Sequence, residues 1–192
     1  MKQILLFVLF SLITLSCGKG NTNEKTENLS EYEGISDKKL CELLTKEMMA
    51  SITGIKFNEE MVTLHQTDPG SGKYVSQCGY YLDGGNIGVL VRRFGNEKFS
   101  KTREGLIGGK ETGDAELDSI MHSAVATSKA VNDLGDAAYF FDLGGIINLI
   151  VVFQDHYQIQ ISCFGKNFGF DDNTLQLSRK VAEEVIKILK SS

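Results

Sequence analysis

The densest apolar stretch outside the N-terminus spans residues 137–163, which read AAYFFDLGGIINLIVVFQDHYQIQISC. Within it, residues 146–153 are apolar at every position except Asn148. A short run rich in Ile and Val and bounded by turn residues predicts a strand buried on both faces. The next segment alternates, with apolar side chains on one face and polar side chains on the other: Tyr157, Ile159, Ile161 and Cys163 against Gln158, Gln160 and Ser162. This alternation predicts a strand with one dry and one solvated face.

Other segments show the same strand signals. Residues 73–82 and 87–94 are predicted strands, and Asp83-Gly84-Gly85-Asn86 between them is typical of a hairpin turn. Residues 61–67 form a further predicted strand. It is followed by Asp68-Pro69-Gly70, a strong turn signal. Residues 129–134 begin the next strand, and Gly135-Asp136 turns the chain into residues 139–142.

Helical periodicity marks both ends of the domain. After a Ser36 cap, one apolar face comprises Leu40, Cys41, Leu44, Met48 and Ile52. Thr45 can cap a second segment that Gly54 ends, so we expect two short helices with a break. A last helix opens at Asn173 or Thr174, and its apolar stripe comprises Leu177, Val181, Val185, Ile188 and Leu189. Two more helices are predicted over residues 96–107 and 115–122.

The order of these elements is helix, strands, helix, strands, helix. It predicts an α+β fold, in which helices cover an antiparallel sheet built from meanders to give an α/β sandwich.

The N-terminus carries the most specific functional signal. A basic start, Met1-Lys2-Gln3, precedes an apolar segment over residues 4–15 that is too short for a confident spanning helix. It ends in Thr14-Leu15-Ser16-Cys17, which resembles the lipobox of bacterial lipoproteins. The lipobox implies cleavage after Ser16 and acylation of Cys17. The alternative is an ordinary signal peptide with an incidental cysteine.

The chain therefore divides into three predicted parts. Residues 1–16 form the lipoprotein signal peptide, residues 17–34 a lipidated cysteine with a disordered polar tether, and residues 35–192 one globular domain. A linear motif for a partner is the alternative role of the tether. The predicted location is the bacterial cell envelope, on the periplasmic or surface side of a membrane.

Charge and composition exclude one class of partner. The 192 residues carry a net charge of −5, which argues against nucleic-acid binding as the main task. An apolar content of 42% is ordinary for a globular protein.

With Cys17 assigned to the lipid, three cysteines remain. Cys41 lies on the apolar face of the first helix, and Cys78 shares a strand face with Tyr80 and Leu82. We therefore predict a Cys41–Cys78 disulfide, with Cys163 as the competing partner. Cys163 otherwise behaves as a small buried hydrophobe.

Four short motifs resemble a family of small secreted bacterial lipoproteins of unknown function. They are Leu40-Cys41-Glu42-Leu43-Leu44-Thr45-Lys46-Glu47, Gly54, Cys78-Gly79-Tyr80-Tyr81 and Leu134-Gly135-Asp136-Ala137-Ala138-Tyr139. The resemblance covers roughly residues 36–189. It implies an α/β sandwich similar to PsbP-like domains and brings no catalytic residues.

No set of catalytic, cofactor-binding or metal-ligating residues stands out. His65, His122 and His156 have no metal-ligand spacing with Cys, Asp or Glu. The leading hypothesis is a lipid-anchored domain, without cofactor, that binds an envelope protein, glycan or small ligand. The rival hypotheses are a scaffold or assembly factor of an envelope complex, and an enzyme that uses His122 or Cys163.

Overall fold

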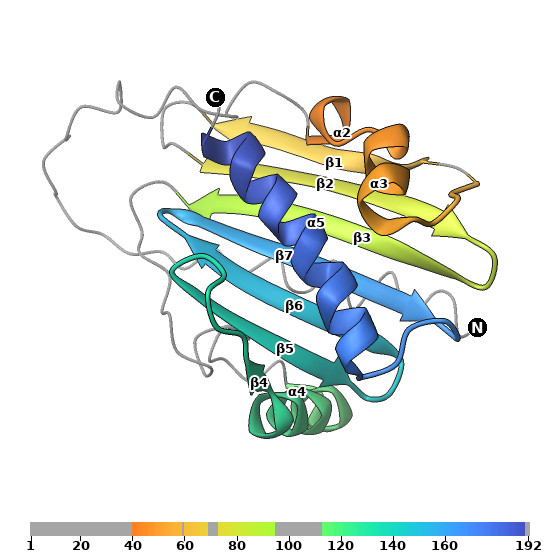
Figure 1. Ribbon diagram of the computed structural model, residues 1–192. Helices are drawn as coiled ribbons and strands as arrows, with labels where there is room; N and C mark the ends of the chain where they lie inside the picture. The colour runs from red at the N-terminus through yellow and green to blue at the C-terminus, as the bar shows by residue number, and fades with distance from the viewer. Residues whose placement is uncertain (1–39, 59, 69–72, 95–112, 191–192) are drawn as a thin grey trace, which may run out of the picture.

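A computed structural model describes residues 40–58, 60–68, 73–94 and 113–190 of the chain. Its centre is an antiparallel sheet of seven strands in the order β1-β2-β3-β7-β6-β5-β4 (Figure 1). The strands are β1 (Glu60–Asp68), β2 (Lys73–Leu82), β3 (Gly85–Phe94), β4 (Lys129–Ala130), β5 (Ala137–Leu143), β6 (Ile147–Gln154) and β7 (Tyr157–Gly165). The helices are α2 (Leu40–Leu43), α3 (Lys46–Thr53), α4 (Ala115–Thr127) and α5 (Asp172–Lys190).

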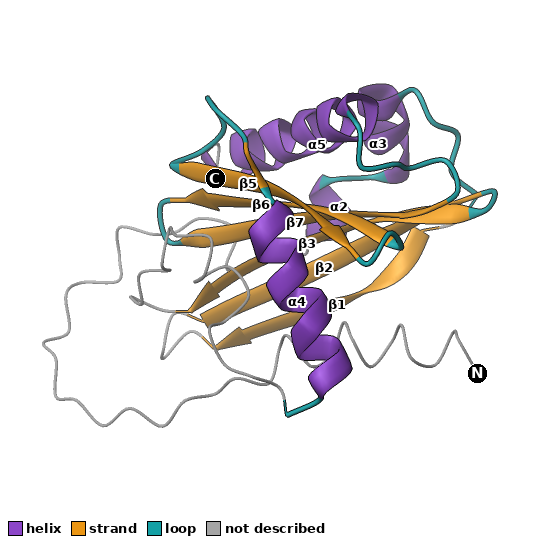
Figure 2. Cartoon of the chain, turned by 90° about the horizontal axis from the view of Figure 1, so that it is seen from below, coloured by secondary structure: helices purple, strands orange, loops and turns teal. Residues whose placement is uncertain are grey.

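The helices lie on both faces of this sheet. Helices α2, α3 and α5 cover one face, and α4 lies on the other (Figure 2). The predicted α+β class, an antiparallel sheet covered by helices, is confirmed. The predicted helix over residues 96–107, the Pro69 turn, the Ser36 cap and all calls on residues 1–34 lie outside the described residues.

Helix α5 forms the main core with the centre of the sheet. Val181 and Val185 from the predicted stripe are fully buried, whereas Leu177, Ile188 and Leu189 are half-buried. The helix begins at Asp172, slightly earlier than predicted, because the Asp171 carboxylate accepts a hydrogen bond from the Thr174 N–H at 2.9 Å.

The first two helices break where the sequence predicts. The Thr45 hydroxyl caps α3 by accepting a hydrogen bond from the Met48 N–H at 3.3 Å, and Gly54 ends the helix with φ +72°. The break changes the helical phase, so Met49 is buried and Met48 is exposed. The prediction that Met48 belongs to the apolar face is therefore wrong.

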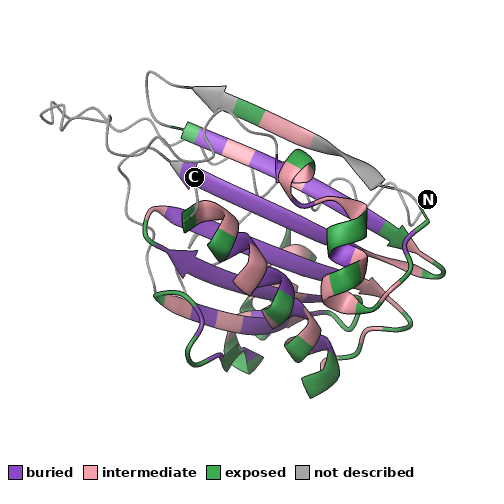
Figure 3. Cartoon of the chain, turned by 45° about the horizontal axis from the view of Figure 1, so that its top comes forward, coloured by how far each residue is buried: buried purple, intermediate pink, exposed green. Residues whose placement is uncertain are grey.

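Strands β6 and β7 form the buried centre of the sheet (Figure 3). β6 is buried almost throughout, but Ile146 lies in the preceding turn and is 54% exposed. The predicted solvated face of β7 is wrong: Gln158 is 1% exposed and Gln160 6% exposed. β7 lies between β3 and β6, and hydrogen bonds among its polar side chains and those of β3 offset their loss of water.

A second, smaller core lies on the other face. Ala124 of α4 packs with Phe141, Val151 and Phe153 of β5 and β6. Helix α4 extends five residues beyond the predicted 115–122 segment, to Thr127. Strand β4 is shorter than predicted, because Asp133 and Gly135 take positive φ values of 58° and 61° and turn the chain away.

Gly135 lies in that turn at a position where the neighbouring strand leaves no room for a side chain. A Cβ at this position would lie 2.7 Å from Val152 Cγ1 and still closer to the Phe153 carbonyl oxygen. Gly145 has a similar φ of 69°, but nothing lies within 4 Å of its added Cβ. Since φ strain alone costs about 1–2 kcal/mol, we expect Gly145→Ala to lose about 1 kcal/mol of unfolding free energy and Gly135→Ala at least about 1 kcal/mol more.

Urea denaturation of both variants measures this difference. Equal losses of unfolding free energy would show that the backbone of β6 yields to the added methyl group.

Candidate functional site

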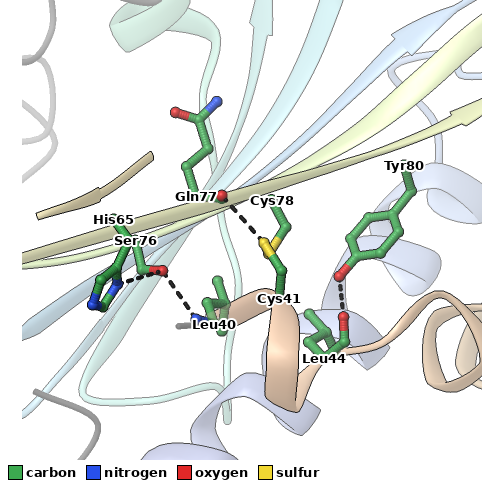
Figure 4. The surroundings of a disulfide bond; sticks show 8 residues. All are labelled: Leu40, Cys41, Leu44, His65, Ser76, Gln77, Cys78 and Tyr80. Atoms are coloured by element: carbon green, nitrogen blue, oxygen red, sulfur yellow. Dashed lines mark hydrogen bonds between the residues drawn. A yellow bond between two sulfur atoms is a disulfide. The ribbon is translucent and has the colours of Figure 1, made fainter. Parts of the chain in front are cut away.

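The predicted Cys41–Cys78 disulfide is present and joins α2 to β2 (Figure 4). The two Cα atoms are 5.6 Å apart. Two buried hydrogen bonds support the same contact: the Leu40 N–H donates to the Ser76 hydroxyl at 3.0 Å, and the Tyr80 hydroxyl donates to the Leu44 carbonyl. For a sequence separation of 37 residues, the chain-entropy model gives about 4 kcal/mol of stabilisation.

His65 and Ser76 lie near this disulfide (Figure 4). The Nδ1 atom of His65 lies 3.4 Å from the Ser76 hydroxyl oxygen. A serine nucleophile has to reach its substrate, but Ser76 is 1% exposed, and its oxygen accepts the Leu40 N–H. This pair therefore holds α2 against the sheet rather than forming a catalytic dyad.

The two residues named for the enzyme hypothesis lie far from each other in the fold. Cys163 faces α5, with its sulfur 3.4 Å from the Ser178 hydroxyl oxygen. Burial raises the pKa of the Cys163 thiol to about 11, so it stays protonated at neutral pH. His122 is exposed on α4, which covers the opposite face of the sheet. The structure does not bring these two side chains together.

The polar face of β7 meets a buried arginine. The Arg92 Nε of β3 donates to Gln158 Oε1, and Gln160 Nε2 donates to the same oxygen at 2.9 Å. Burial lowers the pKa of Arg92 to about 10 because desolvation disfavours the charged form. Amide side chains that satisfy one another inside a sheet fix its register, and this row accounts for the burial of Gln158 and Gln160.

An open groove of about 470 Å³ is the best candidate for a binding site. One wall is the turn of residues 133–136, and the other is the C-terminal half of α5 with Glu183, Ile186, Lys187 and Lys190. Gln154 of β6 also lines it. Polar groups of both charges around a partly apolar hollow can orient a small ligand.

The turn that forms one wall is held from several sides. Arg179 of α5 donates to the carbonyls of Asn132 at 3.1 Å and Asp133 at 3.0 Å. The Asp136 carboxylate accepts the Asp155 N–H at 3.0 Å, and the Asp136 N–H donates to the Phe153 carbonyl at 2.7 Å. Hydrogen bonds within the fold therefore fix the position of this wall.

Charges in the groove differ in how they are compensated. Glu183 pairs with Arg179 at 2.9 Å, and Lys187 pairs with Glu184 at 2.8 Å. Within the part of the chain that the structure describes, the Asp133 carboxylate and the Lys190 ammonium form no hydrogen bond or ion pair. Two of the residues that line the groove thus carry opposite charges that are not paired with each other.

Sequence reasoning predicted the turn in one wall of this groove but not the groove itself. It identified the Gly135-Asp136 turn within the LGDAAY segment, but it gave no role to Asp133 or Lys190. Lys190 comes from the far end of the chain, and only the packing of α5 on the sheet brings it to the turn. A single sequence carries no signal for that juxtaposition.

Other kinds of site find no support in the described ranges. No group of three or more His, Cys, Asp and Glu side chains among these residues could hold a metal ion. None of the described helices is long and apolar enough to cross a membrane.

Comparison with known proteins identifies no relative. No protein-family profile, curated protein or solved structure matches the chain. The resemblance to secreted lipoproteins and to PsbP-like domains therefore stays a prediction.

The buried thiol gives a direct test of the cysteine assignments. In a Cys17→Ser chain, we expect iodoacetamide to alkylate Cys163 at least about a hundredfold more slowly in the native state than in about 8 M urea. The physical reasons are the burial and the raised pKa of the thiol. Peptide mass spectrometry over time measures both rates, and a native rate within a few fold of the unfolded rate would contradict the buried assignment.

Proposed function

We propose that this chain is a lipid-anchored bacterial cell-envelope protein whose folded domain binds a ligand or partner and carries out no chemistry. The observation that supports the proposal most is that the fold accounts for every cysteine of the chain except Cys17. The chain has four cysteines; Cys41 and Cys78 are bonded to each other, and Cys163 is buried. The remaining one, Cys17, stands in the lipobox-like segment Thr14-Leu15-Ser16-Cys17.

The disulfide is compatible with an extracytoplasmic location. Disulfides persist in oxidising compartments such as the periplasm and the cell surface and are rare in the cytosol. A staple that contributes several kcal/mol to stability suits a domain that is exported unfolded and folds after translocation.

Binding suits the described residues better than catalysis does. Ser76 and Cys163 are buried and hydrogen-bonded, so neither is available as a nucleophile. The groove beside residues 133–136 is open and carries charges of both signs. These features support a binding domain held near a membrane surface.

The anchor can be tested at Cys17. Expressed in a bacterium, the native chain should yield an N-terminal peptide with acyl chains on Cys17, and Cys17→Ser should lose that mass completely. Replacing residues 1–17 by a secretory signal with a small-residue cleavage site should move the domain from the membrane to the soluble fraction, because about 0.8 kcal/mol of anchoring per buried CH₂ is lost.

Cys163→Ala is the matched control, since it removes a cysteine inside the fold and should leave the protein in the membrane fraction. An unmodified Cys17 in the native chain would refute the proposal.

A further inference from the structure

We propose that the groove between residues 133–136 and the end of α5 binds a short peptide with free ends. In this proposal the Lys190 ammonium binds the peptide's α-carboxylate and the Asp133 carboxylate binds its α-ammonium group. The proposal rests on the proposed function as a binding domain, and it names the class of ligand.

Within the described ranges, the groove is lined by one acidic and one basic residue whose charges are not paired with any neighbour. Asp133 and Lys190 line the same hollow, yet no ion pair joins them, whereas Glu183 and Lys187 are each paired with a neighbour on α5. Two exposed, unpaired charges of opposite sign along one groove suit a ligand that carries both charges at its two ends. Such a ligand satisfies both side chains at once, and a singly charged ligand satisfies only one.

The turn that carries Asp133 is fixed by hydrogen bonds from α5. Asp133 has a positive φ of 58°, a turn conformation that Asp and Asn adopt more readily than most other non-glycine residues. Arg179 holds it there through the carbonyls of Asn132 and Asp133. A turn fixed by its surroundings at the rim of a groove suits a role in recognition, because a fixed wall lowers the entropy lost on binding.

The other residues that line the groove determine how a ligand can lie in it. Leu134, Ile186 and Gln154 line it but are largely buried, and the Gln154 Nε2 donates to the Asp155 carboxylate at 2.8 Å. They give a peptide little apolar contact, so the exposed charges of Asp133 and Lys190 carry the recognition. The hollow is open to solvent and has a volume of about 470 Å³, so a short peptide lies along it rather than being enclosed by it.

Simpler ligands fit this lining less well. An inorganic anion would meet the carboxylates of Asp133, Asp136 and Glu183 as well as the two lysines. A divalent cation would need a cluster of ligands, and the described residues hold no group of three or more placed for a metal.

Trialanine is the probe, titrated into the detergent-solubilised full chain and followed by backbone amide NMR. We expect shifts at Gly135, Asp136 and Lys190, with a Kd of about 1 mM or tighter. Lys190→Gln should weaken trialanine binding about three- to fivefold, and amidation of the peptide's C-terminus should weaken it equally. The variant and the amidated peptide together should show no further loss, since both remove the same contact.

The same combination of a protein variant with a capped peptide tests Asp133. Asp133→Asn keeps the backbone turn, because Asn tolerates positive φ as well as Asp does. It should weaken trialanine binding about three- to fivefold and leave the affinity for N-acetyl-trialanine unchanged. Lys180→Gln and Glu116→Gln, exposed substitutions outside the groove, are the matched controls and should change neither affinity.

Two results would overturn the inference. One is no shift in the groove up to about 10 mM trialanine. The other is binding that neither capping nor the two groove variants weaken. Neither result bears on the lipid anchor, which the mass of the Cys17 peptide tests separately.

Discussion

The antiparallel ladder between β3 and β7 is the interaction on which the rest of the structure depends. β1, β2 and β3 form one meander, and β4 to β7 form another. The ladder joins them over the whole length of both strands, from Gly85↔Gly165 to Arg93↔Tyr157. At the Gly85↔Gly165 end the two backbones lie very close together, since a Cβ on Gly165 would lie 2.6 Å from the Gly85 Cα atom. Glycine at both positions allows two distant segments to form one continuous sheet.

The other contacts build on that sheet. Helix α5 packs over β6 and β7, and α3 packs against α5. The disulfide and the Tyr80–Leu44 hydrogen bond attach the first helices to β2. The groove exists because the same α5 that covers the core extends past the turn at residues 133–136. Core packing and the candidate site therefore share one helix.

Local patterns predicted the elements, and longer-range contacts decided what the patterns could not show. The break at Thr45, the hairpin between β2 and β3 and the buried run of β6 depend on neighbouring residues, and the sequence alone was enough to place them. The disulfide was predicted from the apolar faces that carry Cys41 and Cys78, with Cys163, which also lies on such a face, as the competing partner. The burial of Gln158 was not predictable, since its partner Arg92 lies 66 residues away in sequence. The same limit applies to Asp133 and Lys190.

The position of the disulfide determines how the folded domain responds to a force applied from its N-terminal side. Tension that enters from the N-terminal side reaches the folded domain at α2, its first described element. At Cys41 the load passes through a covalent bond into β2, which is hydrogen-bonded to β1 and β3 on its two sides. Pulling therefore acts on the sheet through the sulfur–sulfur bond, and α3, which lies within the loop that the bond closes, carries little of it. A domain built in this way resists extension from its N-terminal end as long as that bond stays oxidised.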